Sequence, residues 1–537
     1  MRNRHIPFKA AAGALAATML LSGCGSATAN IEYTGTYDPT GKSILQLAAD
    51  LDSGATTSVE LVEYYLQAIE RNDDKGARIH AITEINPHAI RQARLADRYR
   101  KDHPQHSPLY GLPFVVKENY DVEWMATTAG SEVLKDNVSR VNAPVVQDLI
   151  DEGAFVLAKT NMSELAASFG RLGYSSQGGQ TKNPYNLRRD PSGSSSGTAV
   201  AVAAGFAPFG LGSDTSGSVR GPASVTGLVG MRPTFGNTSR TSVVPLSSDF
   251  DVTGAITNTV EDQAIVLDAI VGPDEEDPVT EHAERNPQYF ERLHQSGLNG
   301  ATLGVVNLFN GGNEEVDEAF RQAQKQLEQA GAKLVTIDLD ESYLNLWSDV
   351  MGPVGDAEFV RDYEWYMRHH GARSNAKTVR QLVDKSKELK GTDHEVNPAR
   401  IEGYETNLKA ADKLHGDAVQ SILNEKMPQL TASVERTMAD NAVSALIYPT
   451  LSCPASVRYD AKDPTYQCEA ADTYAASYLA SAAHLPELTV PMGRDMQNMP
   501  LGLSFVGSKT RESTLLNLGA AYERISPYRN GEGLKLR

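Results

Sequence analysis

Alternation of apolar and polar residues predicts helices and strands from about residue 41 onward. Thr57 and Glu60 match a capping box, and residues 59–69 follow with their apolar members on one helical face. Residues 109–116 form a short apolar run that predicts a buried strand ending at Lys117, and residues 143–152 predict a helix before a second strand at 154–158. This alternation continues to Gly205, so the pattern predicts an α/β fold with a mixed sheet.

The pattern changes between residues 288 and 441, where long charged helices such as 315–330 and 399–423 are predicted. This segment contains no candidate catalytic cluster, so we interpret it as a variable helical layer that covers the fold. Apolar runs typical of strands return at 442–448, 488–490 and 501–506. The C-terminal part therefore completes the same sheet, which predicts one domain over residues 41–530.

The first residues form a separate unit. Arg2, Arg4 and Lys9 precede an uncharged apolar run, Ala10 to Leu21, that is too short to span a bilayer comfortably and is typical of a secretory signal. The run ends in Leu-Ser-Gly-Cys at residues 21–24, which resembles the lipobox of bacterial lipoproteins. The resemblance implies a signal peptide over 1–23, a lipid such as palmitate on Cys24, and a tether over 24–40. The alternative is an ordinary signal peptide with a chance cysteine.

This N-terminus predicts an exported protein that is anchored by lipid to the bacterial cell envelope, on the periplasmic or outer-surface side. The net charge of −18 argues against binding to nucleic acid, which favours a basic face. In an oxidising compartment Cys453 and Cys468 are able to form a disulfide, and two unpaired thiols are the alternative. A metal site at this pair is disfavoured, because no histidine lies close beside either cysteine.

The densest Gly/Ser region, from Ser192 to Gly221, is the best candidate for chemistry. Its first loop opens into an Ala/Val helix, and its second loop, Ser213 to Ser218, offers successive backbone N–H groups to an oxyanion. Residues 193–197 also match the G-x-S-x-G elbow of α/β-hydrolases, with Ser195 as nucleophile. That elbow needs a buried strand directly before it, and the residues before this one are polar and end in Pro191.

Several motifs resemble the amidase signature family. They are GLPFVVKEN (111–119), AKTNMSEL (158–165), PSGSSSGTAVAVAAG (191–205) and LGSDTSGSVRGPASVTGLVGMRPT (211–234), followed by shorter matches at 448–450, 489–493 and 501–507. They occur in order between about residues 43 and 525. The resemblance implies the amidase signature fold, a large, mixed, twisted β-sheet core covered by helices on both faces, and an amidohydrolase acting on linear amides without metal or cofactor.

The resemblance also implies a Ser–cis-Ser–Lys triad. The catalytic lysine corresponds to Lys117, the bridging serine with a cis peptide bond to Ser194, and the nucleophile to Ser218. A serine hydroxyl needs a base to become nucleophilic, and a lysine acts as a base only when burial keeps it neutral. Phe114 precedes Lys117 in an apolar strand, which suits that requirement.

Supporting residues follow from the same motifs. The oxyanion hole corresponds to the backbone of Thr215, Ser216, Gly217 and Ser218, while Asp214 and Arg220 match positions that hold this loop. Ser195 matches a supporting hydroxyl beside the bridging serine.

Two residues depart from the usual pattern, because Ser216 and Ser196 stand where glycine is common in the family. The form GSSSG at 193–197, together with GGQTKNPY at 178–185, most resembles the peptide-amidase branch, which removes the C-terminal amide from peptides. The expected substrate is therefore a small-molecule or peptide amide, cleaved with release of ammonia or an amine.

Three alternatives remain beside this interpretation. The first is an esterase or α/β-hydrolase that uses Ser195, and the second is a catalytically silent binding lipoprotein. The third is the ammonia-generating component of a tRNA amidotransferase, which the predicted export disfavours. The sequence carries no signal for an oligomeric state.

Overall fold

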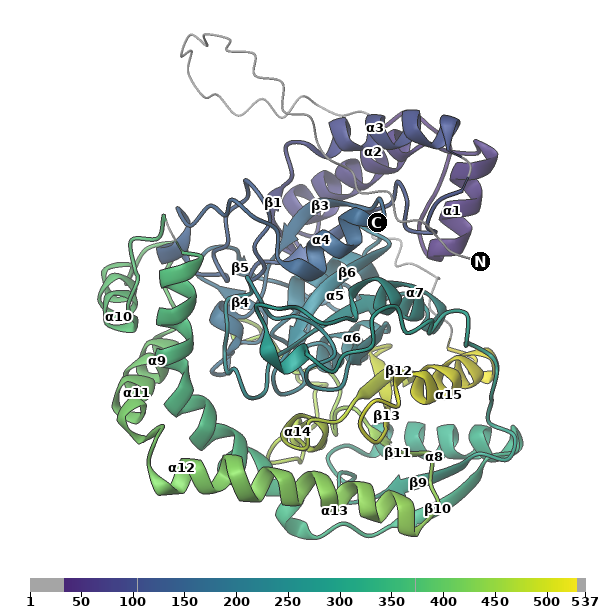
Figure 1. Ribbon diagram of the computed structural model, residues 1–537, viewed down its shortest axis with the longest axis vertical. Coiled ribbons are helices and arrows are strands. Elements are labelled where there is room, and N and C mark those ends of the chain that lie inside the picture. Colours follow the sequence, from purple (N-terminus) through teal and green to yellow (C-terminus); the bar gives the residue numbers. More distant parts are fainter. Residues whose placement is uncertain (1–32, 104, 372, 529–537) are drawn as a thin grey trace.

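One large mixed sheet forms the centre of the protein. The computed structural model describes residues 33–528 except 104 and 372, so the predicted signal peptide and Cys24 lie outside the described residues. Eleven strands run in the order β1-β3-β2-β6-β8-β7-β12-β13-β11-β9-β10 (Figure 1). They are β1 (Ile82–Ile85), β2 (Pro113–Lys117), β3 (Phe155–Thr160), β6 (Phe209–Asp214), β7 (Val229–Arg232), β8 (Val252–Thr257), β9 (Thr302–Val306), β10 (Lys333–Ile337), β11 (Ala445–Pro449), β12 (Glu487–Arg494) and β13 (Pro500–Val506); β4 (Tyr174–Ser175) and β5 (Gly179–Gln180) pair separately.

The sheet combines parallel and antiparallel pairs. Strand β2 is parallel to β3 and β6, the strands from β6 through β8, β7, β12 and β13 to β11 are antiparallel, and β11, β9 and β10 are parallel. The predicted mixed α/β sheet is thus confirmed. Because β2 and β6 are parallel neighbours, their carboxyl ends, at Lys117 and Asp214, lie at the same edge of the sheet.

Helices cover both faces of this sheet. The helices are α1 (Ile44–Ser53), α2 (Ser58–Ile69), α3 (Ala89–Asp102), α4 (Pro144–Asp151), α5 (Ser196–Ala203), α6 (Arg220–Thr226), α7 (Val260–Ile270), α8 (Glu314–Gln329), α9 (Gly352–His369), α10 (Val379–Glu388), α11 (Pro398–Ala410), α12 (Asp417–Ser421), α13 (Met427–Asp440), α14 (Ala475–Ala482) and α15 (Glu512–Ile525). On one face Gly230 lies against Ala223 of α6, and on the other Leu488 lies against Gly519 of α15. The expected capping box of α2 is present, with Thr57 accepting from the Glu60 N–H.

The middle segment differs from the helical layer predicted for residues 288–441. It contains two strands of the main sheet, β9 and β10, which are parallel and are joined by α8. The short runs Thr302–Val306 and Lys333–Ile337 are rich in β-branched residues and flank an amphipathic helix, which is the pattern of a βαβ unit. These two strands were not predicted because each is short and lies beside long charged helices.

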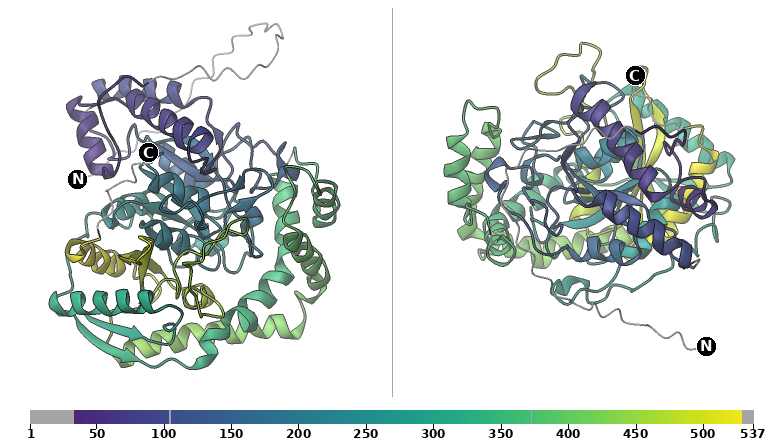
Figure 2. Two further views of the ribbon diagram at one scale, coloured as in Figure 1. Left: turned by 180° about the vertical axis from the view of Figure 1, so that it is seen from behind. Right: turned by 90° about the horizontal axis from the view of Figure 1, so that it is seen from above.

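The remaining helices of this segment, α9 to α13, run along one side and the lower edge of the molecule (Figures 1 and 2). Phe359 and Tyr363 of α9 pack in one buried cluster with Met162 and Val244, which belong to loops beside the sheet. The helical layer therefore contacts the region where the candidate chemistry lies. Within the described residues, the structure contains no helix with the length and apolarity that a membrane crossing requires.

Two further features concern predicted connections. Tyr37, within the predicted tether, donates its hydroxyl to Asp50 of α1 at 2.6 Å, so the last residues before the domain contact it. Cys453 and Cys468 are joined by a disulfide, which is the predicted pairing.

Candidate active site

Lys117 lies at the carboxyl end of β2 and is completely buried. Its Nζ is 2.8 Å from Ser194 Oγ, 2.9 Å from Ser213 Oγ and 3.2 Å from the Ser213 carbonyl oxygen. Burial lowers the pKa of Lys117 to about 7, and the nearby carboxylates of Asp214 and Asp251 only partly oppose this effect. A substantial fraction of the side chain is therefore neutral near neutral pH and is able to accept a proton.

Ser194 lies between Lys117 and the second Gly/Ser loop. The Gly193–Ser194 peptide bond is cis, as the family resemblance implied. The Ser194 carbonyl accepts from the Ser163 N–H at 3.1 Å, and the Ser195 N–H donates to the Ser218 carbonyl at 3.1 Å. These contacts bring the first Gly/Ser loop, which opens α5, directly against the loop that contains Ser218.

The second loop, residues 214–218, turns sharply out of β6. Gly217 has a φ of 113°, a conformation that L side chains rarely adopt, and the Asp214 carboxylate accepts the Gly217 N–H at 3.0 Å. The Gly217 N–H is therefore already engaged by a protein acceptor, and the expected contribution of Gly217 to an oxyanion hole stays a prediction. Among residues 33–528 as described, the N–H groups of Thr215, Ser216 and Ser218 have no protein acceptor.

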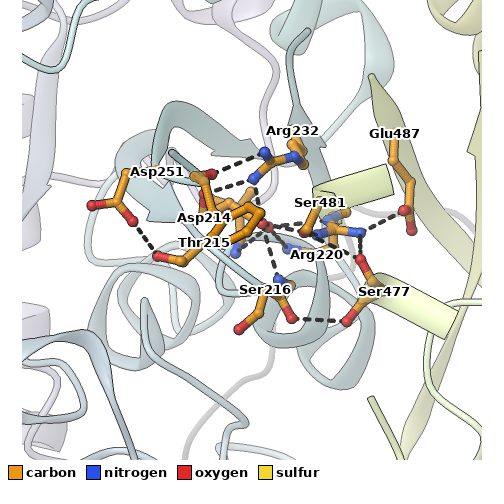
Figure 3. Close-up of polar contacts among 12 residues, drawn as sticks. Asp214, Thr215, Ser216, Arg220, Arg232, Asp251, Ser477, Ser481 and Glu487 are labelled. Carbon is orange, nitrogen blue, oxygen red and sulfur yellow. Dashed lines mark hydrogen bonds and ion pairs between the residues drawn. The ribbon is translucent and has the colours of Figure 1, made fainter. Parts of the chain in front are cut away.

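A buried ion network holds this loop in place (Figure 3). Arg220 donates to both carboxylate oxygens of Asp214, at 2.8 and 3.0 Å, and to Glu487 at 2.5 Å, while Arg232 donates to the Asp214 carbonyl at 2.8 Å. Burial alone would raise the pKa of Asp214, but the attraction of Arg220 and Arg232 holds it well below its usual range. Arg220 also donates to the carbonyl of Ser477, which ties the loop to α14.

The other side of the loop is held by Asp251, which sequence reasoning did not single out. The Asp251 carboxylate accepts from Thr215 Oγ1 (Figure 3). It also accepts from the backbone N–H groups of Leu246 and Ser247. Asp251 directly precedes β8, and β8 pairs with β6 in the antiparallel sense, so the pairing itself brings it to Thr215. No local motif marks this residue, because its partners come from separate parts of the chain.

Four further residues reach the site only because the folded sheet brings separate segments together. They are Ser213, Asn119, Arg232 and Glu487. Ser213 and Asn119 lie inside the quoted motifs, and Asn119 Nδ2 donates to Ser213 Oγ at 3.0 Å. Arg232 lies near the end of the fourth motif, and Glu487 stands two residues before the match at 489–493. The position of these residues within or beside a motif was the only sign in the sequence that they belong to the site. Their contacts could not be predicted from the sequence.

Ser195, the residue of the alternative elbow, has a different environment. Its Oγ lies 3.2 Å from the Ser213 carbonyl and 3.3 Å from the Ser213 N, so the hydroxyl bonds to backbone on both sides, and the side chain is completely buried. It precedes α5, and no strand lies directly before it. This environment agrees with a supporting hydroxyl.

Both serines that stand in place of glycine form hydrogen bonds within or beside these loops. Ser196 Oγ donates to the Ser192 carbonyl at 2.7 Å, and the Ser216 carbonyl accepts from Ser477 Oγ at 2.8 Å. Within the described residues, no group of three His, Cys, Asp or Glu side chains is placed to hold a metal ion.

Comparisons with known proteins agree with this arrangement. The amidase family model matches residues 60–516. The chain belongs to the amidase family. It is 31% identical over 493 residues to a glutamyl-tRNA(Gln) amidotransferase subunit from Caldanaerobacter subterraneus subsp. tengcongensis, covering 90% of this chain and 96% of that protein.

Solved structures show the same fold. The native peptide amidase of Stenotrophomonas maltophilia is 32% identical and superimposes with a TM-score of 0.82 over 93% of this chain and 98% of that one. An amidase family protein from Bacillus anthracis is 31% identical, with a TM-score of 0.79 and coverage of 91% of each chain. The protein is thus an amidase-family hydrolase of C–N bonds with the amidase signature fold, and it acts on amides.

Proposed function

We propose that the protein hydrolyses linear carboxylic amides through an acyl-enzyme on Ser218. The observation that carries this proposal is the contact between Lys117 Nζ and Ser194 Oγ. Lys117 is buried and has a pKa of about 7, and the loop that contains Ser194 is hydrogen-bonded to the loop that contains Ser218. A base that is neutral near pH 7 activates a serine through a bridging hydroxyl.

The steps follow from these positions. Ser194 passes the proton of Ser218 Oγ to Lys117 while Ser218 attacks the amide carbon, and the oxyanion that forms is stabilised by the free N–H groups of Thr215 and Ser216. The proton returns through Ser194 to the departing nitrogen, so that the C–N bond breaks and ammonia or an amine leaves. Water then hydrolyses the ester on Ser218 by the same proton route and releases the carboxylic acid.

The substrate class proposed is the C-terminal amide of peptides. It is supported by the GSSSG loop at 193–197 and by the similarity in fold and sequence to the Stenotrophomonas maltophilia peptide amidase. A second candidate is glutamine, as a source of ammonia, because amidotransferase subunits are equally similar in sequence. Measuring ammonia release from peptide amides and from free glutamine in parallel distinguishes the two.

Labelling with a fluorophosphonate tests the nucleophile. The full-length protein is treated, digested and mapped by mass spectrometry, and a single adduct on Ser218 is expected. An adduct on Ser195 would instead support the esterase interpretation, and a protein that forms no adduct and releases no ammonia would be a silent binding lipoprotein.

We also propose that the protein is exported and anchored through a lipid on Cys24. The support is the basic and apolar N-terminal run followed by the lipobox-like residues 21–24. Replacing Cys24 by alanine should leave an unprocessed precursor that no longer carries a fatty acid. Processing and membrane recovery identical to those of the unmodified protein would contradict the anchor.

A further inference from the structure

A cavity of about 180 Å³ begins beside the catalytic residues. Its lining includes Ser213, whose Oγ is 2.9 Å from Lys117 Nζ, and Thr215 of the oxyanion loop. At about 30 Å³ for a water molecule in the liquid, this volume corresponds to roughly six waters, which is enough for a short alkyl chain. The cavity is therefore large enough, and near enough to the reacting groups, to receive part of a substrate.

The inner end of the cavity presents an unpaired acceptor. Asn119 lines the cavity and is 2% exposed, and its Oδ1 has no hydrogen-bond partner among the described residues. The orientation of this amide is set by its other end, because Nδ2 donates to Ser213 Oγ at 3.0 Å and to the Val244 carbonyl at 3.4 Å. A buried carbonyl oxygen left without a donor is costly, so Oδ1 is an acceptor available to an N–H group of a bound molecule.

The outer end is negatively charged. Arg240 is the one cation among the described residues of the lining. It forms an ion pair with Asp277, to which it donates hydrogen bonds of 2.6 and 2.9 Å. Asp362 accepts from Arg361 and from the Ser248 N–H. Glu276 remains: it is exposed, and its carboxylate forms no hydrogen bond or ion pair with another described residue.

An exposed aromatic side chain also lines the cavity. Trp365 of α9 is 47% exposed and lines the cavity together with Tyr366. One part of the wall is apolar and is formed by the stretch Val243 to Leu246. An exposed indole and a carboxylate in the lining of one cavity favour an organic ammonium group, and an apolar wall suits the methylene chain that leads to it.

We propose that this cavity binds the side chain of a cationic amide substrate. An N–H of the substrate pairs with Asn119 Oδ1, its alkyl chain lies along the Val243–Leu246 wall, and its terminal ammonium faces Glu276 and Trp365. The preferred substrates are then carboxamides that carry a primary ammonium a few methylenes away, such as peptides ending in lysinamide. This inference rests on the proposed amidase function and specifies its substrate class.

Binding is tested first, without turnover. The full-length Ser218→Ala variant is titrated calorimetrically with 5-aminopentanamide and with pentanamide, which lacks the ammonium. Tighter binding of the cationic amide is expected, and Glu276→Gln in the same background should reduce the preference about three- to fivefold. Glu275→Gln is the matched control, since Glu275 is the exposed neighbour that does not line this cavity, and it should leave the preference unchanged.

Turnover then separates this inference from the proposed function. The ratio of kcat/KM for an acetylated lysinamide to that for the matching norleucinamide should exceed one, and it should fall in Glu276→Gln but not in Glu275→Gln. Equal binding of the two pentanamides, or a preference that Glu276→Gln does not change, overturns the cavity assignment even if amides are hydrolysed. Selective binding that depends on Glu276, without hydrolysis of any amide, supports the cavity and contradicts the amidase mechanism.

Discussion

The pH dependence of activity is the most direct test of Lys117 as the base. Burial lowers its pKa from 10.5 to about 7, so about nine-tenths of the side chains are neutral at pH 8. With the ordinary pKa, roughly 3 in 1,000 would be neutral at that pH, so burial alone supplies roughly 300-fold more active enzyme. We expect kcat/KM for a peptide amide to rise with pH to a plateau, with an apparent pKa of about 7.

The assay is ammonia release between pH 5 and pH 9.5 at constant ionic strength, with a substrate that does not titrate in this range. At pH 6 the rate should lie about tenfold below the plateau. Lys117→Arg should be inactive throughout, because a guanidinium stays protonated and accepts no proton. A rate that stays constant from pH 5 to pH 9.5, or the same pH dependence in Lys117→Ala, would refute the assignment of Lys117 as the base.

The same pKa has a consequence for stability that does not depend on turnover. Because the native-state pKa of Lys117 lies below its unfolded value, the unfolded chain binds more protons between about pH 7 and 10.5, and stability rises with pH across that window. The contribution of this one group between pH 7 and 9 is roughly 2 kcal/mol. Urea unfolding of Lys117→Met should lack this increment, and a parallel pH slope in both proteins would argue that Lys117 is charged in the native state.

Three further substitutions test the loop. Ser218→Ala should abolish amide hydrolysis and fluorophosphonate labelling while the melting temperature stays the same; residual acyl transfer would place the nucleophile elsewhere. Arg220→Met leaves Asp214 and Glu487 less well paired in the interior and should cost about 3–5 kcal/mol in urea unfolding; a loss below 1 kcal/mol would show that the network is not needed for stability. Gly217→Ala adds a Cβ at φ +113° and 2.6 Å from a neighbouring serine hydroxyl, so it should lower kcat more than binding, and unchanged kcat would contradict a rigid loop.

Much of the fold was predictable because its signals are local. The capping box of α2, the apolar run that ends at Lys117 and the C-terminal strand patterns each depend on a few neighbouring residues, and the structure contains all three elements. Strands β9 and β10 were missed because each has only five residues. Their place in the sheet depends on the pairing of β9 with β11, which lies more than 100 residues later in the chain, and β10 joins the sheet only through β9.

The same distinction separates the parts of the site that could be foreseen from those that could not. Lys117 and Ser194 were expected from the resemblance of their motifs to the amidase signature family, and the structure brings Lys117 Nζ within 2.8 Å of Ser194 Oγ. The hydrogen bond from the Gly217 N–H to Asp214 could not be predicted from the sequence, since it depends on the orientation of the Asp214 side chain within the folded loop. The role of Asp251 was hidden because it arises from the pairing of β6 with β8.

The structure also explains how a neutral lysine coexists with a buried carboxylate close by. An unpaired Asp214 would attract a proton to Lys117 and remove the base, since opposite charges stabilise each other strongly where water is excluded. Arg220 and Arg232 both donate to Asp214, so most of its charge is balanced locally and burial dominates the pKa of Lys117. The ion network therefore does two things at once. It holds the loop that contains the proposed oxyanion donors, and it limits the effect of the Asp214 charge on the pKa of Lys117, the proposed base.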